Sequence, residues 1–280
     1  MPRRPTDPHV FWRDPALPYL EAREIMDGRT VCYVPHSHPT FSIGAITGGH
    51  SIYVTGNDRF EAFEGTVVLM NPEVVHACNP ADDQPWSYRM LYADTAWLAA
   101  VQGQVDFQPL GAVISRDPDL YAGLMALFDL LFDDRVETGR KGAAARSFFA
   151  GLADRVDGPG VPVADEHAAL ARAAGHITRH CTWELRVEEV AAASGLSASY
   201  LIRAFKARYG LTPHAYQTNQ RIRVGQEGLR RGQPIVDVAL EAGFADQAHF
   251  QRVFKAHVAA TPGQYAQSVS GQHGDGPQGQ

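Results

Sequence analysis

The sequence contains few cysteines and no pattern that would pair them or let them bind a metal. Cys32, Cys78 and Cys181 are the three cysteines among 280 residues, an odd number without a Cys-x-x-Cys spacing. A disulfide framework or a zinc finger is therefore not expected, and the thiols are expected to stay reduced.

Long apolar runs are missing as well. No stretch approaches the roughly 18 apolar residues that a membrane-spanning helix needs. The first residues, MPRRPTDPHVFW, carry two arginines but lack the apolar segment of a secretory signal. A content of 45% hydrophobic and 20% charged residues is typical of a globular chain. We therefore expect a cytoplasmic protein that does not associate with membranes.

Common catalytic motifs are absent too. The sequence has no glycine-rich phosphate loop, no Gly-x-Ser-x-Gly and no His-Glu-x-x-His, and no set of residues suggests nucleophilic catalysis. We therefore predict that the protein is not an enzyme and that it needs no cofactor.

The chain also lacks an overall positive charge, but its charge is unevenly distributed. The formal net charge is −6, with a net of −10 in residues 1–169 and a net of +5 in residues 170–270. An acidic front half joined to a basic back half is typical of a chain in which only the back half contacts phosphate. By itself the signal is weak, because many domains of this size reach +5 without binding DNA.

The hydrophobic pattern divides the chain into a β part and a helical part. Residues 30–95 alternate short β-branched and aromatic runs with Gly, Pro, Asn and Asp, which predicts a small barrel or sandwich. The expected strands cover residues 41–46, 51–54, 66–70 and 86–92. From residue 120 the period becomes helical, a second helix is expected over 143–156, and short helices are expected from about 168 to 268.

The basic segment contains the same supersecondary unit twice. In LRVEEVAAASGLSASYLIRAFKARYG (185–210) a short helix, a turn at Gly195 and a second helix that begins after Ser197 form a helix-turn-helix. IVDVALEAGFADQAHFQRVFKAH (235–257) repeats the pattern with Gly243 in the place of Gly195, and Thr-Pro-x-x-Tyr follows both copies. Two copies at a near-constant offset are much harder to obtain by chance than one.

The pattern I-x-x-V-A-x-x-x-G-F-x-x-x-x-x-F-x-x-x-F-K, closed by T-P-x-x-Y, resembles the AraC/XylS family of transcription regulators. The resemblance covers roughly residues 168–268, with two departures, at Ala259 and Ala266, where the family usually has Gly and Arg. It implies two recognition helices that enter successive major grooves about 34 Å apart on one face of promoter DNA. A single arginine on a helix is more often just exposed to solvent. Here Arg203 and Arg252 occupy matching positions in the two copies, which favours contact with DNA instead.

The resemblance also implies which residues contact DNA. Base contacts are expected from exposed positions of both second helices: Ser199, Ile202, Arg203, Asp246, Gln247, Gln251 and Arg252. Phosphate contacts are expected from five basic residues: Lys206, Arg208, Arg221, Arg223 and Lys255. Phe205, Phe250 and Phe254 are expected in the core.

Three histidines mark the β part. His36 and His38 in PHSHPTFSIG and His76 in NPEVVHACNP resemble the pattern of a cupin-like barrel and, more narrowly, the effector-binding domain of AraC-type regulators. The expected small-molecule site comprises His36, His38, Tyr53, His76, Trp86 and Tyr88. A His₃ metal site at His36, His38 and His76 and a purely structural role are the alternatives; Ser42, Ile43 and Gly44 stand where metal-binding cupins have a Glu.

Taken together, the sequence predicts an α+β regulator with a cupin-like β-barrel, helices and an all-α DNA-binding domain. The expected segments are an effector-binding domain over 1–110, helices over 111–156, a linker over 157–167, the DNA-binding domain over 168–268 and a disordered tail over 269–280.

One helical segment carries an apolar stripe that either packs on the β domain or joins two subunits: Leu120, Leu124, Leu127, Phe128 and Leu131. Promoter DNA, a small effector, RNA polymerase and a second copy are the expected partners. A metal-dependent cupin enzyme with a helical appendage, and a DNA-binding protein whose barrel only dimerises, are the rival functions.

Overall fold

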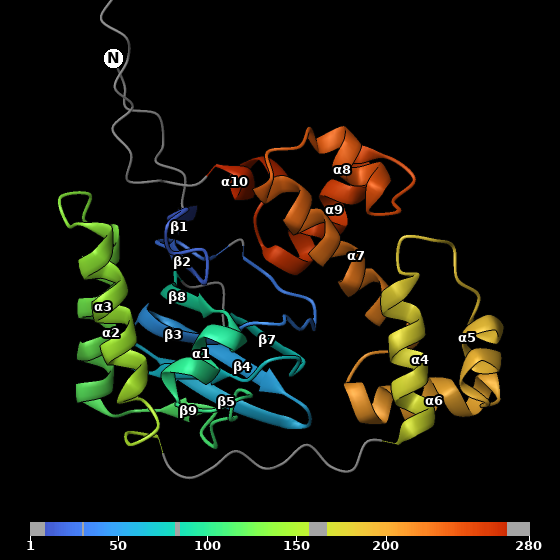
Figure 1. Ribbon diagram of the computed structural model, residues 1–280, viewed down its shortest axis with the longest axis horizontal. Helices are drawn as coiled ribbons and strands as arrows, with labels where there is room; N and C mark the ends of the chain where they lie inside the picture. The colour runs from blue at the N-terminus through green and yellow to red at the C-terminus, as the bar shows by residue number, and fades with distance from the viewer. Residues whose placement is uncertain (1–8, 30, 82–84, 157–166, 268–280) are drawn as a thin grey trace, which may run out of the picture.

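The computed structural model describes residues 9–29, 31–81, 85–156 and 167–267. In Figure 1 a β domain lies between a pair of helices, α2 and α3, and a helical domain that follows in sequence. The expected linker and C-terminal tail lie almost wholly outside the described residues.

The strands of the β domain form two antiparallel sheets. The six-stranded sheet has the order β1-β2-β8-β3-β6-β9 and the three-stranded sheet has the order β5-β4-β7. The strands are β1 (His9–Arg13), β2 (Leu20–Ile25), β3 (Phe41–Gly48), β4 (His50–Thr55), β5 (Asp58–Phe63), β6 (Val67–Met70), β7 (His76–Pro80), β8 (Ser87–Ala93) and β9 (Ile114–Ser115). Among the described residues these strands pair into two sheets, so the expected sheet-rich N-terminal domain is present, and strand pairing does not close it into a single barrel.

The large sheet is buried on both faces, and alternation along each strand decides which side chains lie on which face. On β8, Leu91 and Ala93 belong to the core cluster beneath α2 and α3, whereas Tyr88 and Met90 belong to the cluster on the opposite face. On β6, Leu69 and Val68 divide in the same way. One face of the sheet therefore carries the helices, and the other is left for a pocket.

Three helices follow the sheet: α1 (Thr95–Val101), α2 (Pro118–Phe132) and α3 (Thr138–Ala150). The predicted stripe from Leu120 to Leu131 is buried in the core cluster of the large sheet. This outcome supports the packing alternative over the subunit-joining one, because the stripe is already covered by its own chain.

The helical domain comprises α4 (Ala168–Arg179), α5 (Val187–Ser194), α6 (Ala198–Tyr209), α7 (Pro213–Arg230), α8 (Ile235–Glu241), α9 (Gln247–Val258) and α10 (Pro262–Ala266). The repeated Thr-Pro pairs begin α7 and α10. Thr212 and Thr261 each accept a hydrogen bond from a backbone N–H of the first turn, and the prolines take the first helical position, where no N–H is needed. The duplication predicted from the sequence is therefore a duplication of structure.

The four expected strands and the helix-turn-helix pairs are present at nearly the expected residues. Strands β1, β2, β5, β7 and β9 were not among the four expected. β1 and β2 lie before the segment in which alternation is clear. Within the described residues, no helix is both long and apolar enough to cross a membrane.

Candidate functional site

A pocket opens between the two sheets, with about 440 Å³ of space between its walls and its mouth. Its walls come from the inward positions of β3, β6, β7 and β8 and from the segment that joins β2 to β3. Thirteen residues line it: Tyr33, His36, His38, Gly44, Ile46, Val68, Met70, His76, Cys78, Trp86, Tyr88, Met90 and Tyr92.

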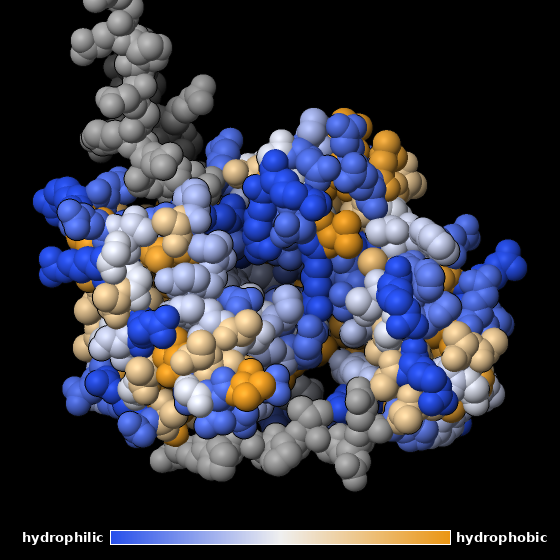
Figure 2. Space-filling view, in the orientation of Figure 1, coloured by the Kyte–Doolittle hydropathy of each residue, from blue (hydrophilic) through white to orange (hydrophobic). Residues whose placement is uncertain are grey.

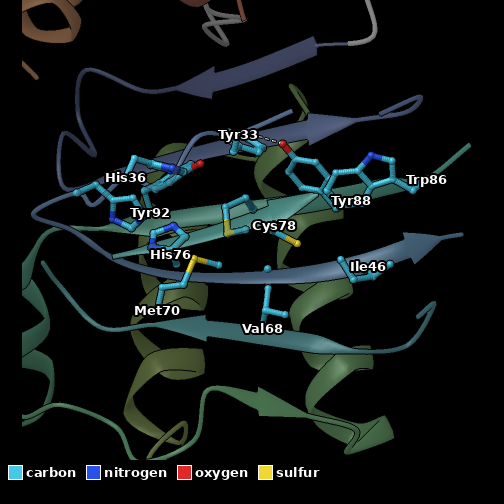
Figure 3. A pocket seen from close by; sticks show the side chains of 13 residues that line it. Tyr33, His36, Ile46, Val68, Met70, His76, Cys78, Trp86, Tyr88 and Tyr92 are labelled. Carbon is cyan, nitrogen blue, oxygen red and sulfur yellow. Dashed lines mark hydrogen bonds between the residues drawn. The ribbon is translucent and has the colours of Figure 1, made fainter. Parts of the chain in front are cut away.

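The three predicted histidines come together in the pocket lining, and Figure 3 shows His36 and His76 at one end of it. Ring centroids of His36 and His76 lie 4.7 Å apart, those of His38 and His76 lie 4.9 Å apart, and those of His36 and His38 lie 6.2 Å apart. The backbones of His36 and His76 also pair through two reciprocal N–H···O hydrogen bonds. This pairing fixes the segment before β3 against the start of β7, and so brings together residues forty positions apart.

Each of these imidazoles has Nδ1 within hydrogen-bond distance of a backbone carbonyl. The acceptors are Val34 for His36, Thr40 for His38 and Val74 for His76. Burial lowers the pKa of His38 to about 3, with a further contribution from His76, and it lowers the pKa of His76 to about 4. At neutral pH the rings are therefore uncharged.

A metal site at His36, His38 and His76 was the alternative to a small-molecule site. Over the residues that the structure describes, no group of three or more His, Cys, Asp and Glu side chains is arranged to hold a metal ion.

Tyrosines line a further part of the pocket wall. The Tyr33 and Tyr88 hydroxyls hydrogen-bond to each other, and Tyr33 accepts a hydrogen bond of 2.7 Å from the Arg23 guanidinium. Ile46, Val68 and Met70 make another part of the wall apolar. The pocket therefore has distinct polar and apolar regions.

Five of the six predicted effector residues line the pocket, and Tyr53 does not. Tyr53 is fully buried beside Cys78, its cross-strand partner, and is not among the lining residues. Trp86 supplies a ring, while its Nε1 donates to Gly28 O and is not available to a ligand. Among the residues that were missed, Tyr92 could have been found from the alternation Tyr88-x-x-x-Tyr92, whereas Tyr33 lies in an irregular segment without periodicity.

The second candidate surface is formed by the two helix-turn-helix units. Gly195 ends α5 with φ 75°, a left-handed conformation that glycine adopts without steric cost, and Gly243 has φ 81° in the second unit. Leu201 and Phe205 of α6 and Phe250 and Phe254 of α9 are fully buried, as predicted.

Most predicted base-contacting side chains are exposed on the two second helices. They are Ser199, Ile202 and Arg203 on the first, and Gln247, Gln251 and Arg252 on the second, with Lys206 and Lys255 exposed one turn further along. Asp246 is exposed as well, and its carboxylate also caps α9 by accepting a hydrogen bond from the His249 N–H.

The predicted phosphate contacts on α7 are engaged within the protein. Arg221 donates hydrogen bonds to the carbonyl oxygens of Cys181 and Trp183. Arg223 forms an ion pair with Glu73 of the β domain and donates to the Ser37 hydroxyl. Their sequence neighbourhood gave no sign of these partners, which lie about 40 and 150 residues away. Arg208, beside the Tyr209 ring, is half-buried.

The β domain and the helical domain are joined by a polar interface. Asn219 of α7 is buried and exchanges hydrogen bonds with the backbone N–H and C=O of Ser37, between two pocket histidines. The end of α9 is held as well, because Arg23 donates to Val258 O at 2.6 Å and to Ala259 O at 3.3 Å. Figure 2 shows this face hollowed where the two domains meet. Ser37, which lies between two pocket-lining histidines, is thus in contact with α7. Arg23, which donates to the pocket-lining Tyr33, is in contact with the end of α9.

Two family models match the chain. An AraC-like ligand binding domain covers residues 17–149, and a helix-turn-helix domain covers residues 190–268. The probable transcription factor PqrA of Proteus vulgaris is 33% identical over 85 residues, which are 30% of this chain and 70% of PqrA. The uncharacterized regulator YbfI of Bacillus subtilis is 23% identical over 221 residues, covering 76% of this chain and 80% of YbfI.

Other matches are shorter or show the fold alone. The regulator MtrA of Neisseria gonorrhoeae is 35% identical over 83 residues, 29% of this chain, and the chain spans only 28% of MtrA. An apo form of ToxT from Vibrio cholerae, carrying a single substitution, superposes with a TM-score of 0.60 at 14% identity, over 89% of this chain and 97% of that one. ToxT bound to an unsaturated fatty acid superposes with a TM-score of 0.57 at 15% identity, over 94% and 96% of the two chains.

Proposed function

This chain belongs to the AraC family of transcription regulators, and on that basis we propose that it binds promoter DNA through α6 and α9 under the control of a small molecule in the β-domain pocket. The observation that carries the DNA-binding half is the duplicated unit. In both copies the matching phenylalanines of the second helix, Phe205 and Phe254, are buried, while the arginines at matching positions, Arg203 and Arg252, are exposed.

An exposed helix of this kind fits the major groove, where each base pair presents its own pattern of donors and acceptors. Arg203 and Arg252 are proposed to read guanine O6 and N7, and Gln247 and Gln251 to read adenine. Lys206 and Lys255 are proposed to contact phosphates and to position the helices without reading sequence. Contact of Arg223 with DNA would require its ion pair with Glu73 to open.

The control half rests on the pocket and on the interface. The neutral histidines, the tyrosine hydroxyls and the apolar wall offer a small molecule both hydrogen bonds and apolar contact. The ToxT bound to a fatty acid has a related fold and supports the idea that such a domain holds an effector. An effector shifts the protein between DNA-engaged and disengaged arrangements only if it binds those arrangements with different affinity.

The contacts that would carry such a shift are those of Ser37 with Asn219 and of Arg23 with the end of α9. We further propose that the regulator acts in the cytoplasm, as a homodimer that recruits RNA polymerase, rather than as an enzyme. The named relatives are transcription regulators, which is consistent with this role.

The division of DNA contacts is tested with two substitutions on one helix. Arg252→Ala should weaken binding to the specific site by about 1–3 kcal/mol and relax the preference at one base position. Lys255→Ala should weaken binding to specific and random DNA alike and flatten the dependence of affinity on salt.

Binding is measured by fluorescence anisotropy on a site selected from random DNA, at several salt concentrations. Arg231→Ala is the matched control, since Arg231 is exposed at the end of α7, outside both recognition helices. If Arg252→Ala and Lys255→Ala changed specific and random binding equally, the proposed division of base and phosphate contacts would be wrong.

A further inference from the structure

A buried cation lies on the pocket face of the large sheet. Arg23 pairs across the strands with Met90, which lines the pocket, so the two side chains lie on the same face. Its side chain is 1% exposed, and a guanidinium stays protonated in proteins. Among the described residues no carboxylate forms an ion pair with it, although a buried charge without a counter-charge is costly.

The groups around Arg23 accept its protons and leave another proton unused. A guanidinium can only donate, so Tyr33 O accepts from Arg23 Nη1. The Tyr33 and Tyr88 hydroxyls share one hydrogen bond, which uses one of their two protons. Within the described residues neither hydroxyl has another acceptor. One O–H of this pair is therefore available to an acceptor group in the pocket.

The remaining lining carries no negative charge that would repel an anion. No Asp or Glu is among the lining residues, and the histidines are uncharged at neutral pH. Met70, Val68 and Ile46 offer apolar contact to the rest of a ligand, as Figure 3 shows. A ligand with a negative group would meet the free hydroxyl proton and would lie near the unpaired guanidinium.

From this geometry we propose that the pocket binds a small organic anion with an apolar body, whose carboxylate accepts a hydrogen bond from the Tyr33–Tyr88 hydroxyl pair and supplies the counter-charge of Arg23. The inference rests on the proposed effector role of the pocket and names its ligand class. Since the same guanidinium donates to Val258 O and Ala259 O, the anion would act on the group that holds the end of α9.

The test uses the full chain and three matched sets of probes at pH 7.5. Benzoate, phenylacetate and hexanoate are each compared with the corresponding amide and the corresponding primary amine by isothermal titration calorimetry. At least one carboxylate is expected to bind about tenfold or more tightly than its amide, and the amines are expected not to bind measurably. The proposal fails if no carboxylate binds more tightly than its amide, or if an amine binds as well as the acid.

Two substitutions locate the carboxylate. Tyr33→Phe and Tyr88→Phe keep the ring and remove one hydroxyl, and each should weaken carboxylate binding about tenfold while changing the affinity for the amide less than about threefold. Tyr53→Phe is the control, because the Tyr53 hydroxyl is buried outside the pocket lining. Thermal unfolding of each variant checks that the fold is retained. Equal affinity of all three variants for the carboxylate would overturn the assigned site.

The outcome is separable from that of the DNA-binding proposal. These titrations contain no DNA, and Arg252→Ala should bind the carboxylate as the unaltered chain does, because Arg252 lies on an exposed face of α9. Loss of carboxylate selectivity would leave DNA recognition standing, and loss of specific DNA binding would leave the anion site standing.

Discussion

At the scale of single residues, burial fixes the charge state of the pocket. The rings of His36, His38 and Tyr53 surround His76, and burial is what lowers the pKa of His76 to about 4. A neutral imidazole keeps one ring nitrogen as a donor and the other as an acceptor. The pocket therefore offers hydrogen bonds without adding charge beside Arg23.

The same burial predicts a pH dependence of stability. Well above pH 6.5 His76 is neutral in the folded and the unfolded chain and contributes no slope. As the pH falls from about 6.5 towards 4, the unfolded chain takes up a proton that folded His76 does not, so the free energy of unfolding falls by up to about 1.4 kcal/mol per pH unit from this residue. Urea unfolding at pH 7.5, 6.5 and 5.5 measures this slope.

His76→Gln should reduce that slope by about the stated amount. The control is His214→Gln, since solvent reaches the His214 ring in both the folded and the unfolded chain. If the slope between pH 6.5 and 5.5 were the same with and without the His76 imidazole, burial of a neutral ring would not be the cause.

Single residues also show what the sequence could and could not predict. The positions of Phe205, Phe250 and Phe254 followed from helical periodicity, which is a local property. The Val258 carbonyl that accepts from Arg23 lies 235 residues away along the chain, and the Glu73 carboxylate that pairs with Arg223 lies 150 residues away, so no local pattern contains them. The histidine cluster could be predicted from motif resemblance, whereas Tyr33 is placed by Asn79, which bonds to its backbone N–H and C=O.

At the scale of elements, the ends of the two recognition helices differ in one informative way. α6 ends at Gly210 with φ 73°, and α9 ends at Ala259 with φ 53°, so an alanine adopts the left-handed conformation in the second unit. That conformation costs a non-glycine residue about 1 kcal/mol. The Ala259 methyl is buried in the β-domain cluster of Ile25 and Val31, which offsets about 0.8 kcal/mol. The alanine at position 259, where the AraC family usually has glycine, is thus explained by the packing of its methyl group against the β domain.

This balance predicts opposite outcomes for matched substitutions. Ala259→Gly should change the free energy of unfolding by less than about 1 kcal/mol, because relief of strain offsets the lost methyl. Gly210→Ala should destabilise by about 1 kcal/mol or more, because its new Cβ would be strained and would lie 3.1 Å from the Val75 side chain. Urea unfolding of both variants measures the difference. If Gly210→Ala left the free energy of unfolding unchanged, the end of α6 would not require the left-handed conformation.

Element boundaries in the helical domain were predictable because capping residues mark them. Ser197, Thr212 and Thr261 each cap a helix, and Gly195 ends one. The order of strands within each sheet was not predictable, because the sequence specifies alternation on a strand but not which distant strand pairs with it.

At the scale of the whole molecule, the helical domain is held along one side by the β domain. The second unit contacts it through Arg23 and through Arg13, which donates to Tyr265 O, whereas α7 contacts it through Asn219 and Arg223. Apolar contacts accompany these polar ones, since Phe11 of β1 belongs to the core cluster of the second unit and Ala259 to a core cluster of the β domain. The arrangement therefore links pocket, interface and recognition helices within one chain.

Two groove-reading helices in a single chain are the central feature proposed for this protein, and a footprint tests them most directly. A selected site is bound at one chain per duplex and probed with hydroxyl radicals. We predict two protected stretches about one helical turn, or roughly 34 Å, apart on the same face, with Arg203→Ala weakening one and Arg252→Ala the other. A single protected stretch that either substitution weakens equally would contradict this prediction.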